Sequence, residues 1–155
     1  MSYKRFFQNS ANEIIRDFTS FGDPFLLILV SAIAIGVNFK LAAVIIGLAF
    51  IELFSSTIKF FYYKKRPKQE KYDNFLERIN AGSFPSLHSA RSSFVFVSLF
   101  FLFNNNYLRI VLLLIPLIVG LTRISLKKHY ISDIIAGYVI GILASIAIKL
   151  CGFFN

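Results

Sequence analysis

Apolar and polar residues form separate blocks along this chain, with long hydrophobic runs divided by short polar breaks. A helix needs roughly 17 to 25 mostly apolar residues to cross the hydrocarbon core of a bilayer. By this rule the sequence predicts five membrane spans, at residues 22–38, 40–63, 86–103, 107–126 and 130–153. Three of the breaks are short, so we expect the spans that they join to run antiparallel.

Two segments outside these spans have a different character. In residues 1–21, phenylalanine and isoleucine recur at helical spacing among charged residues, which is typical of a helix lying in the membrane interface. Residues 64–85 form the one long loop and carry charges of both signs. The sequence therefore predicts an all-α fold and a single domain over residues 1–155. That domain is an integral membrane bundle of about five transmembrane helices preceded by an amphipathic interfacial helix.

Composition supports the membrane class and excludes an ordinary soluble protein. Hydrophobic residues make up 56% of the chain, and Phe alone occurs 19 times. Residues 1–20 mix charged and apolar side chains throughout, so the sequence does not predict a cleavable signal peptide. Cys151 is the single cysteine, which rules out a disulfide within the chain.

Basic residues gather at one mouth of the predicted bundle. If the spans alternate in direction, residues 1–21, the loop 64–85 and the turn at 127–128 share one face. Of the 17 lysines and arginines, 14 then lie on this face or at helix ends that open onto it. By the positive-inside rule, this excess would place the mouth in the cytoplasm.

Several residues at this mouth have the chemistry of an oxyanion site. Arg66 and Arg123 can each offer a planar fork to two oxygens, while Lys59 supplies a point charge. The Pro85-Ser86 pair begins the third predicted span, where free backbone N–H groups and the positive end of the helix dipole bind anions. Such a set of groups suits an oxyanion with two or three negative charges, and phosphate is the natural candidate.

Three further residues supply the groups that phosphoryl transfer needs. His129 and Asp133 stand at i and i+4 of the predicted fifth helix, so the carboxylate can accept a hydrogen bond from one ring nitrogen. The other nitrogen is then left as a nucleophile. His88 can protonate a lipid alkoxide as it leaves. We expect no metal and no cofactor, because the cations already neutralise the transferring group.

These residues fall into three motifs within residues 59–133, namely Lys59-x6-Arg66-Pro67, Pro85-Ser86-x-His88 and Thr122-Arg123-x5-His129-x3-Asp133. In this order and spacing they resemble the three-part signature of the type 2 phosphatidic acid phosphatase superfamily. Leu87 stands where the family commonly has Gly, and Thr122 stands where it commonly has Ser. Thr keeps the hydroxyl, whereas the Leu side chain narrows the pocket and affects which substrate fits. Family members often have six spans, so this chain resembles a short form that lacks the first.

The resemblance implies a role for each matched residue. It implies a phosphohistidine intermediate on His129, orientation of that ring by Asp133 and protonation of the leaving group by His88. It also implies phosphate binding by Lys59, Arg66, Ser86, the Leu87 backbone N–H and Arg123. Membrane members of the superfamily characteristically work on the outer or lumenal face. The resemblance therefore implies an extracytoplasmic active site, against the charge count.

Other charged residues have competing interpretations. The lysines beside the motifs are predicted to anchor lipid headgroups, and they are Lys64, Lys65, Lys68, Lys127 and Lys128. Arg91, three residues after His88, either contacts a headgroup or forms a structural pair. Glu52 lies in the middle of a span, where a carboxylate is costly, and we favour a buried structural hydrogen bond over a catalytic role. His129 and Asp133 could also be a pair of metal ligands, but no third and fourth ligand of suitable type lies at typical spacing, so a metal site is not favoured.

Two classes of function remain. One is a membrane phosphatase acting on a lipid phosphate or diphosphate, and the other is a non-catalytic phospholipid-binding or transport protein. Headgroup binding needs cations but no nucleophile, acid and orienting carboxylate, so the sequence favours the enzyme. Candidate substrates are polyprenyl diphosphate, which we slightly favour, phosphatidylglycerophosphate, phosphatidate and lipid A phosphates. We expect a multi-pass protein of the cell membrane whose partners are its lipid phosphate substrate and membrane lipids, with no nucleic acid. The oligomeric state is not readable from the sequence.

Overall fold

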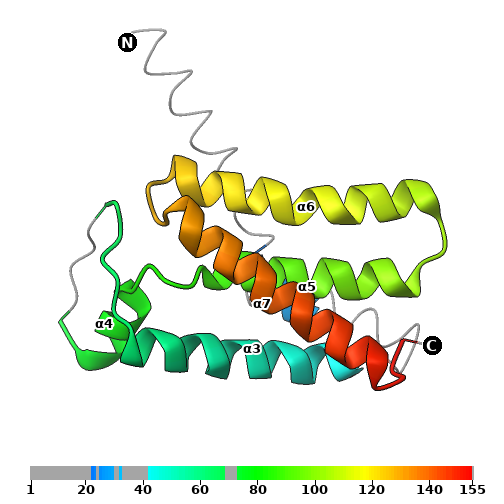
Figure 1. The fold of residues 1–155 in the computed structure, drawn as a ribbon, viewed down its shortest axis with the longest axis horizontal. Helices are drawn as coiled ribbons and strands as arrows, with labels where there is room; N and C mark the ends of the chain where they lie inside the picture. Colours follow the sequence, from blue (N-terminus) through cyan, green and yellow to red (C-terminus); the bar gives the residue numbers. More distant parts are fainter. Residues whose placement is uncertain (1–21, 24, 30–31, 33–41, 69–72, 155) are drawn as a thin grey trace, which may run out of the picture.

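The computed structural model describes residues 22–23, 25–29, 32, 42–68 and 73–154. The predicted interfacial helix at residues 1–21 and most of the first predicted span lie outside these residues. Residues 25–29, within the first predicted span, are helical. Five further helices follow in the described part: α3 (Ala42–Phe61), α4 (Phe75–Ala81), α5 (Leu87–Leu102), α6 (Asn106–Ser125) and α7 (Ile131–Leu150). Figure 1 shows α3, α5 and α6 lying side by side, with α7 crossing them obliquely.

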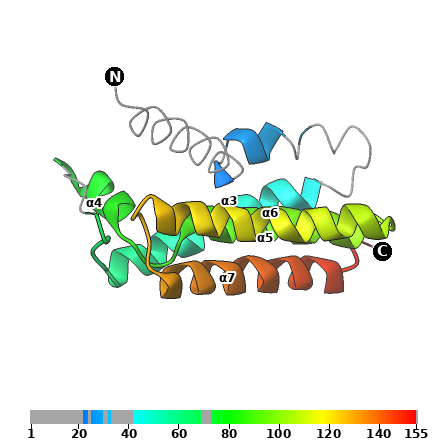
Figure 2. The ribbon, with the colours of Figure 1, turned by 90° about the horizontal axis from the view of Figure 1, so that it is seen from above.

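Helix α5 is the centre of the bundle. It packs against α3, α6 and α7, and all but one of the residues from Ser89 to Leu99 are buried. Seen from above, α7 lies along one side of the other long helices (Figure 2). The first residues of α5 therefore lie among the ends of its neighbours, which is where the predicted site residues occur.

Small residues let α7 approach α5 closely. Gly137, Gly141 and Ser145 recur every four residues along the buried face of α7. A Cβ atom at Gly141 would lie 2.1 Å from Ser93 Oγ and 2.3 Å from the Ala90 carbonyl oxygen. Lipid tails are as apolar as leucine, so helices in membranes associate through close packing and hydrogen bonds, which small residues permit. Gly137 and Gly141 thus set how near the start of α7 lies to the start of α5.

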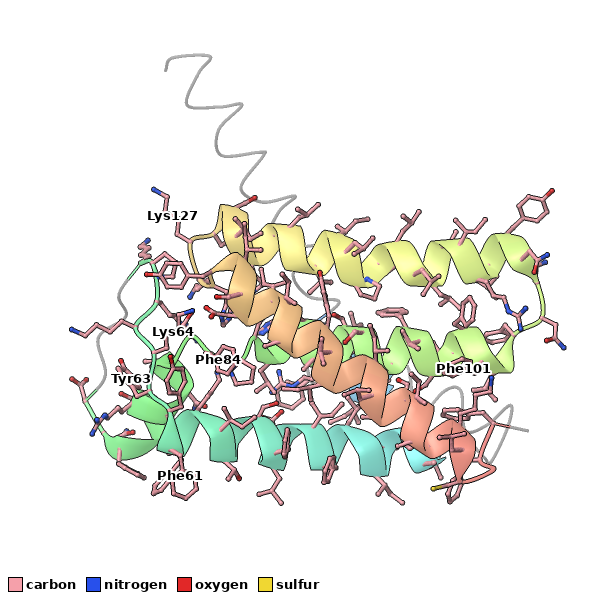
Figure 3. All side chains as sticks on the ribbon, viewed as in Figure 1. Phe61, Tyr63, Lys64, Phe84, Phe101 and Lys127 are labelled. Carbon is pink, nitrogen blue, oxygen red and sulfur yellow. The ribbon has the colours of Figure 1, made fainter. Side chains whose placement is uncertain are left out.

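The outward faces of these helices are apolar. Exposed side chains on α3 and α6 include Phe50, Leu53, Leu117 and Leu121, and Phe61 at the end of α3 points away from the bundle (Figure 3). In the part of the chain that the structure describes, α3, α6 and α7 are long and apolar enough to cross a membrane. Helix α5 is shorter, at 16 residues. The predicted spans 40–63, 86–103, 107–126 and 130–153 coincide with α3, α5, α6 and α7 to within three residues at each end.

The segment 64–85, predicted as a loop, contains the short helix α4. Asn74 caps this helix, its side-chain oxygen accepting a hydrogen bond from the Glu77 backbone N–H at 2.8 Å. The Glu77 carboxylate in turn accepts from the Asp73 backbone N–H at 2.8 Å. Such mutual capping is a helix-start signal that can be read from sequence, and the loop prediction overlooked it.

Candidate active site

The predicted site residues lie at one end of the bundle, where α3 and α6 end and α5 and α7 begin (Figure 1). Lys59 is in the last turn of α3 and Arg123 is in the last turn of α6. Ser86 is the N-cap of α5, immediately before Leu87 and His88. His129 precedes α7. Segments that are far apart in the sequence thus supply one group of polar side chains.

Three cations lie close enough to act on the charge of the His129 imidazole. The charges of Arg66, Arg123 and Lys59 all act on this ring. Lys59, Arg123 and His129 are buried, with 5%, 6% and 3% of their surfaces exposed. Burying several cations together is costly unless an anion neutralises them. The cluster therefore has the charge and the donors to hold a multiply charged oxyanion.

The start of α5 adds backbone donors to this cluster. The Ser86 side chain caps the helix by accepting from the Ser89 backbone N–H, and its hydroxyl also lies 2.9 Å from the Ser89 hydroxyl. Leu87 is the first residue of the helix, so its backbone N–H belongs to the first turn, where amides have no partner within the helix. A helix N-terminus of this kind favours anions through its dipole and its N–H groups.

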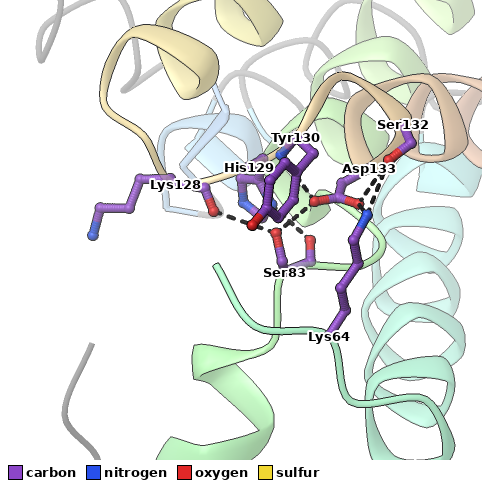
Figure 4. A network of polar contacts seen from close by, with 7 residues as sticks. All are labelled: Lys64, Ser83, Lys128, His129, Tyr130, Ser132 and Asp133. Carbon is purple, nitrogen blue, oxygen red and sulfur yellow. Dashed lines mark hydrogen bonds and ion pairs between the residues drawn. The ribbon is translucent and has the colours of Figure 1, made fainter. Parts of the chain in front are cut away.

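The predicted hydrogen bond between His129 and Asp133 is wrong for this structure. Helix α7 begins at Ile131 with Tyr130 as its N-cap, so His129 lies outside the helix and the i, i+4 relation does not apply. The ring nitrogen Nδ1 of His129 instead lies 2.6 Å from the backbone carbonyl oxygen of Ser83 (Figure 4). A carbonyl only accepts hydrogen bonds, so the proton belongs on Nδ1 and the lone pair on Nε2.

Asp133 is linked to His129 through Ser83. The Ser83 hydroxyl donates to the Asp133 carboxylate, and the Tyr130 backbone N–H donates to the same carboxylate at 2.9 Å. The Lys64 ammonium lies 2.6 Å from its other oxygen. Figure 4 shows these contacts converging on the fully buried carboxylate. Any orientation of the imidazole by Asp133 therefore passes through the backbone of Ser83.

Sequence reasoning missed Ser83 and assigned Lys64 to headgroup anchoring. Ser83 acts through its carbonyl oxygen and its hydroxyl together, and the carbonyl role is independent of side-chain type. Its position two residues before the Pro85-Ser86 pair was the one available signal. The Lys64 contact with Asp133 spans 69 positions in the chain, so no local pattern could reveal it.

The environment keeps His129 in its neutral form. Burial lowers the pKa of His129, and the charges of Arg66, Arg123 and Lys59 lower it further, to about 3. The hydrogen bond to Ser83 opposes this shift in part. With a pKa so far below neutrality, the ring carries a free lone pair at physiological pH, as a nucleophile requires.

His88 and Arg91 lie on successive turns of α5. Arg123, Lys59 and His129 all act electrostatically on the His88 ring. His88 therefore belongs to the same cluster. The Arg91 guanidinium donates twice to the Glu52 carboxylate on α3. This ion pair is the structural pairing considered for both residues. The Glu52 side chain is 47% exposed, however, so the expected burial of this carboxylate is wrong. Contact between Arg91 and a lipid headgroup stays a prediction.

Two further features concern access and metals. An open cavity of about 490 Å³ lies beside His129, between the end of α6 and the start of α7, and Ile124, Tyr130 and Ile131 are among its walls. Among the described residues, no three His, Cys, Asp or Glu side chains lie close enough to hold a metal ion. Metal independence of the reaction stays a prediction.

Comparison with known proteins agrees with this architecture. Residues 25–155 match the PAP2 superfamily. A transmembrane PAP2 type phosphatidylglycerolphosphate phosphatase from Bacillus subtilis has a similar structure, with a TM-score of 0.74 and 19% identity over 92% of this chain and 76% of that one. LpxE of Aquifex aeolicus is also similar, with a TM-score of 0.74 and 21% identity over 90% of this chain and 86% of that one. No curated protein matches the sequence.

Proposed function

This chain belongs to the PAP2 superfamily, and on that basis we propose that it is an integral-membrane phosphatase that hydrolyses a lipid phosphate or diphosphate through a phosphohistidine on His129. The observation that carries the proposal is the buried His129 ring, held through Nδ1 by the Ser83 carbonyl oxygen and acted on by the charges of three cations that lower its pKa. A protein that only bound headgroups would need the cations. It would have no need of a buried, oriented imidazole with its lone pair free.

In the first step the phosphoryl group is transferred to the enzyme. Arg66, Arg123 and Lys59 hold the phosphate oxygens, together with Ser86 and the Leu87 backbone N–H. The Nε2 lone pair of His129 attacks phosphorus and forms an N–P bond while the bond from phosphorus to the lipid oxygen breaks. The bound phosphate offsets the charge of the surrounding cations, so His88 can carry a proton in the substrate complex. It gives this proton to that oxygen, and the lipid leaves as an alcohol or, from a diphosphate, as a monophosphate.

In the second step water releases the phosphate. The now neutral His88 takes a proton from a water molecule, whose oxygen attacks phosphorus and breaks the N–P bond. His129 regains its lone pair, and His88 is again protonated for the next turnover. The three cations neutralise the charge on the equatorial oxygens in both steps, so the proposed reaction requires no metal.

A lipid substrate suits the surroundings of the nucleophile. The cavity beside His129 has apolar walls at Ile124 and Ile131, and both side chains are exposed on the outside of the bundle. A lipid chain in the hydrocarbon can therefore extend along these walls toward His129. Among lipids we favour a polyprenyl diphosphate, because a small chain with only one loop beyond tight turns, at residues 64–85, suits a simple headgroup. The fold similarity to a phosphatidylglycerolphosphate phosphatase keeps that lipid phosphate as the main alternative.

Phosphate release from a panel of lipids tests the proposal. Purified protein in detergent should release phosphate from at least one of polyprenyl diphosphate, phosphatidylglycerophosphate, phosphatidate and lipid A phosphates. Release should continue in EDTA and should be inhibited by vanadate. His129→Ala should retain the fold and lose turnover. Activity that disappears in EDTA and returns only with a divalent cation would contradict the metal-free reaction, and full activity in His129→Ala would contradict the nucleophile.

A further inference from the structure

Lys64 lies three residues after the end of α3, and its side chain points toward the start of α7. The ammonium lies 2.6 Å from Asp133 Oδ1 and 3.0 Å from Ser132 Oγ. It also lies 4.7 Å from the centre of the Tyr130 ring and 5.9 Å from that of the Phe84 ring. Figure 4 shows the side chain directed at Asp133. A lysine that anchors a lipid headgroup would direct its ammonium outward instead.

The backbone of Lys64 contacts the same network. Its carbonyl oxygen accepts a hydrogen bond from the Ser83 backbone N–H at 2.7 Å. The Ser83 hydroxyl donates to Asp133, and the Ser83 carbonyl oxygen lies 2.6 Å from His129 Nδ1. Lys64 therefore fixes Ser83 in two ways, directly through the backbone and indirectly through the carboxylate that binds the Ser83 hydroxyl.

Resting on the proposed function, we infer that Lys64 is a positioning residue that sets the orientation and tautomer of the His129 nucleophile through Asp133 and Ser83. Asp133 is fully buried, and a buried carboxylate stays charged only when it is paired and hydrogen-bonded. The ammonium of Lys64 supplies that pairing. The charged carboxylate then holds the Ser83 hydroxyl, and the Ser83 carbonyl holds the proton on Nδ1 of His129.

Loss of this one charge affects every link in the network. Without the ammonium, Asp133 takes up a proton or turns toward other donors, and a protonated carboxyl no longer requires the Ser83 hydroxyl as a donor. Ser83 can then rotate, and its carbonyl oxygen leaves Nδ1. The proton of the neutral ring becomes free to occupy Nε2, which removes the lone pair from the attacking nitrogen.

The first test compares Lys64→Met with Lys65→Met. Lys65 is the neighbouring lysine and is exposed, so its variant removes the same surface charge without touching the network. Residues that hydrogen-bond to the ligands of a metal site typically contribute about 10-fold to 100-fold to activity, and we expect the same range for a residue that positions a nucleophile. We expect Lys64→Met to lower kcat by about that factor with KM changed less than about threefold. Lys65→Met should keep the wild-type kcat, because the headgroup contact predicted for Lys65 affects lipid binding and lies outside the network. Equal losses in the two variants, or a change confined to KM, would assign Lys64 to lipid binding.

A double-mutant cycle separates positioning from a general loss of structure. In an Asp133→Asn background the target of the ammonium is already gone, so Lys64→Met should then cost little more in kcat. Full additivity of the two losses would contradict the inference. If Lys64→Met does not fold, Lys64→Gln, which can still donate a hydrogen bond but carries no charge, is judged by the same criteria.

A spectroscopic readout makes the inference independent of the substrate. The chain has two histidines, so 15N-labelled ring nitrogens can be assigned with a His88→Gln variant. In the wild type, the His129 ring should show a protonated Nδ1 and an unprotonated Nε2 near neutral pH. Lys64→Met should show a mixture of tautomers, and Lys64→Arg should restore the wild-type pattern. An unchanged tautomer in Lys64→Met would overturn the inference about Lys64, whether or not any lipid is hydrolysed. Failure of the wild type to hydrolyse every tested lipid would count against the proposed function alone.

Discussion

Replacing Gly141 with alanine should disable the site from a distance. The new Cβ would lie 2.1 Å from Ser93 Oγ and 2.3 Å from the Ala90 carbonyl oxygen. Carbon and oxygen atoms normally approach no closer than about 3.3 Å. The serine side chain can turn away, but the Ala90 carbonyl belongs to the backbone of α5. Helix α7 must therefore move away from α5 by about 1 Å.

This shift determines the expected losses. Overpacking of this kind costs typically about 1 to 3 kcal/mol of stability. Gly141 lies eight residues after Asp133 on the same helix, and a displaced helix carries both ends with it. A misplacement of about 1 Å can reduce a reaction rate by about 100-fold. We therefore expect Gly141→Ala to lower kcat by about this factor and to lower the unfolding temperature in detergent.

The matched control is Ala147→Val, which adds bulk to an exposed position of the same helix. It should leave turnover and unfolding temperature unchanged. Ser93→Gly combined with Gly141→Ala should not restore activity, since the contact with the Ala90 carbonyl remains. Wild-type turnover and stability in Gly141→Ala would refute the claim that close packing of α7 on α5 aligns the site.

Three further outcomes are expected. Burial and nearby cations hold the pKa of His129 at about 3. Arg123→Gln removes one of those charges, so the pKa of His129 should rise and the acid limb of kcat/KM should move to higher pH. No movement, or a movement to lower pH, would contradict the assignment of that limb to His129. Arg91→Met leaves the Glu52 carboxylate without its ion-pair partner. The Arg91→Met variant should therefore unfold at a lower temperature than the Arg91→Met/Glu52→Gln double variant. The reverse order would exclude a structural ion pair. A cysteine placed at Asn74, in a chain without its native cysteine, should react with a membrane-impermeant thiol reagent on intact cells; protection until the membrane is permeabilised would place the site in the cytoplasm.

The long helices could be predicted because the membrane imposes their length. A spanning segment must be continuously apolar, so the edges of α3, α6 and α7 follow from where charge begins and ends. The location of the site followed for a related reason. Lys59 and Arg123 stand at the C-terminal ends of apolar runs. Antiparallel packing places the end of one helix beside the start of the next, so these residues fall at the same end of the bundle.

The connection between His129 and Asp133 could not be predicted, because it depends on the residue at which α7 begins. Tyr130 is the N-cap, and tyrosine is not among the residues that usually mark a helix start. A start two residues earlier would have placed His129 and Asp133 on one helical face. The structure instead places Ser83 between them, and contacts of that kind depend on the tertiary fold.

Trapping the phosphorylated enzyme tests the phosphohistidine on His129 directly. Wild-type protein should be mixed with a lipid substrate carrying radioactive phosphate and quenched within one turnover in alkali, in which phosphohistidine survives. Label should appear on the protein at His129, formed and lost at rates consistent with turnover, and His129→Ala should carry none. Rapid hydrolysis of the substrate by the wild type with no labelled protein at any time, or equal labelling of His129→Ala, would exclude the phosphohistidine intermediate.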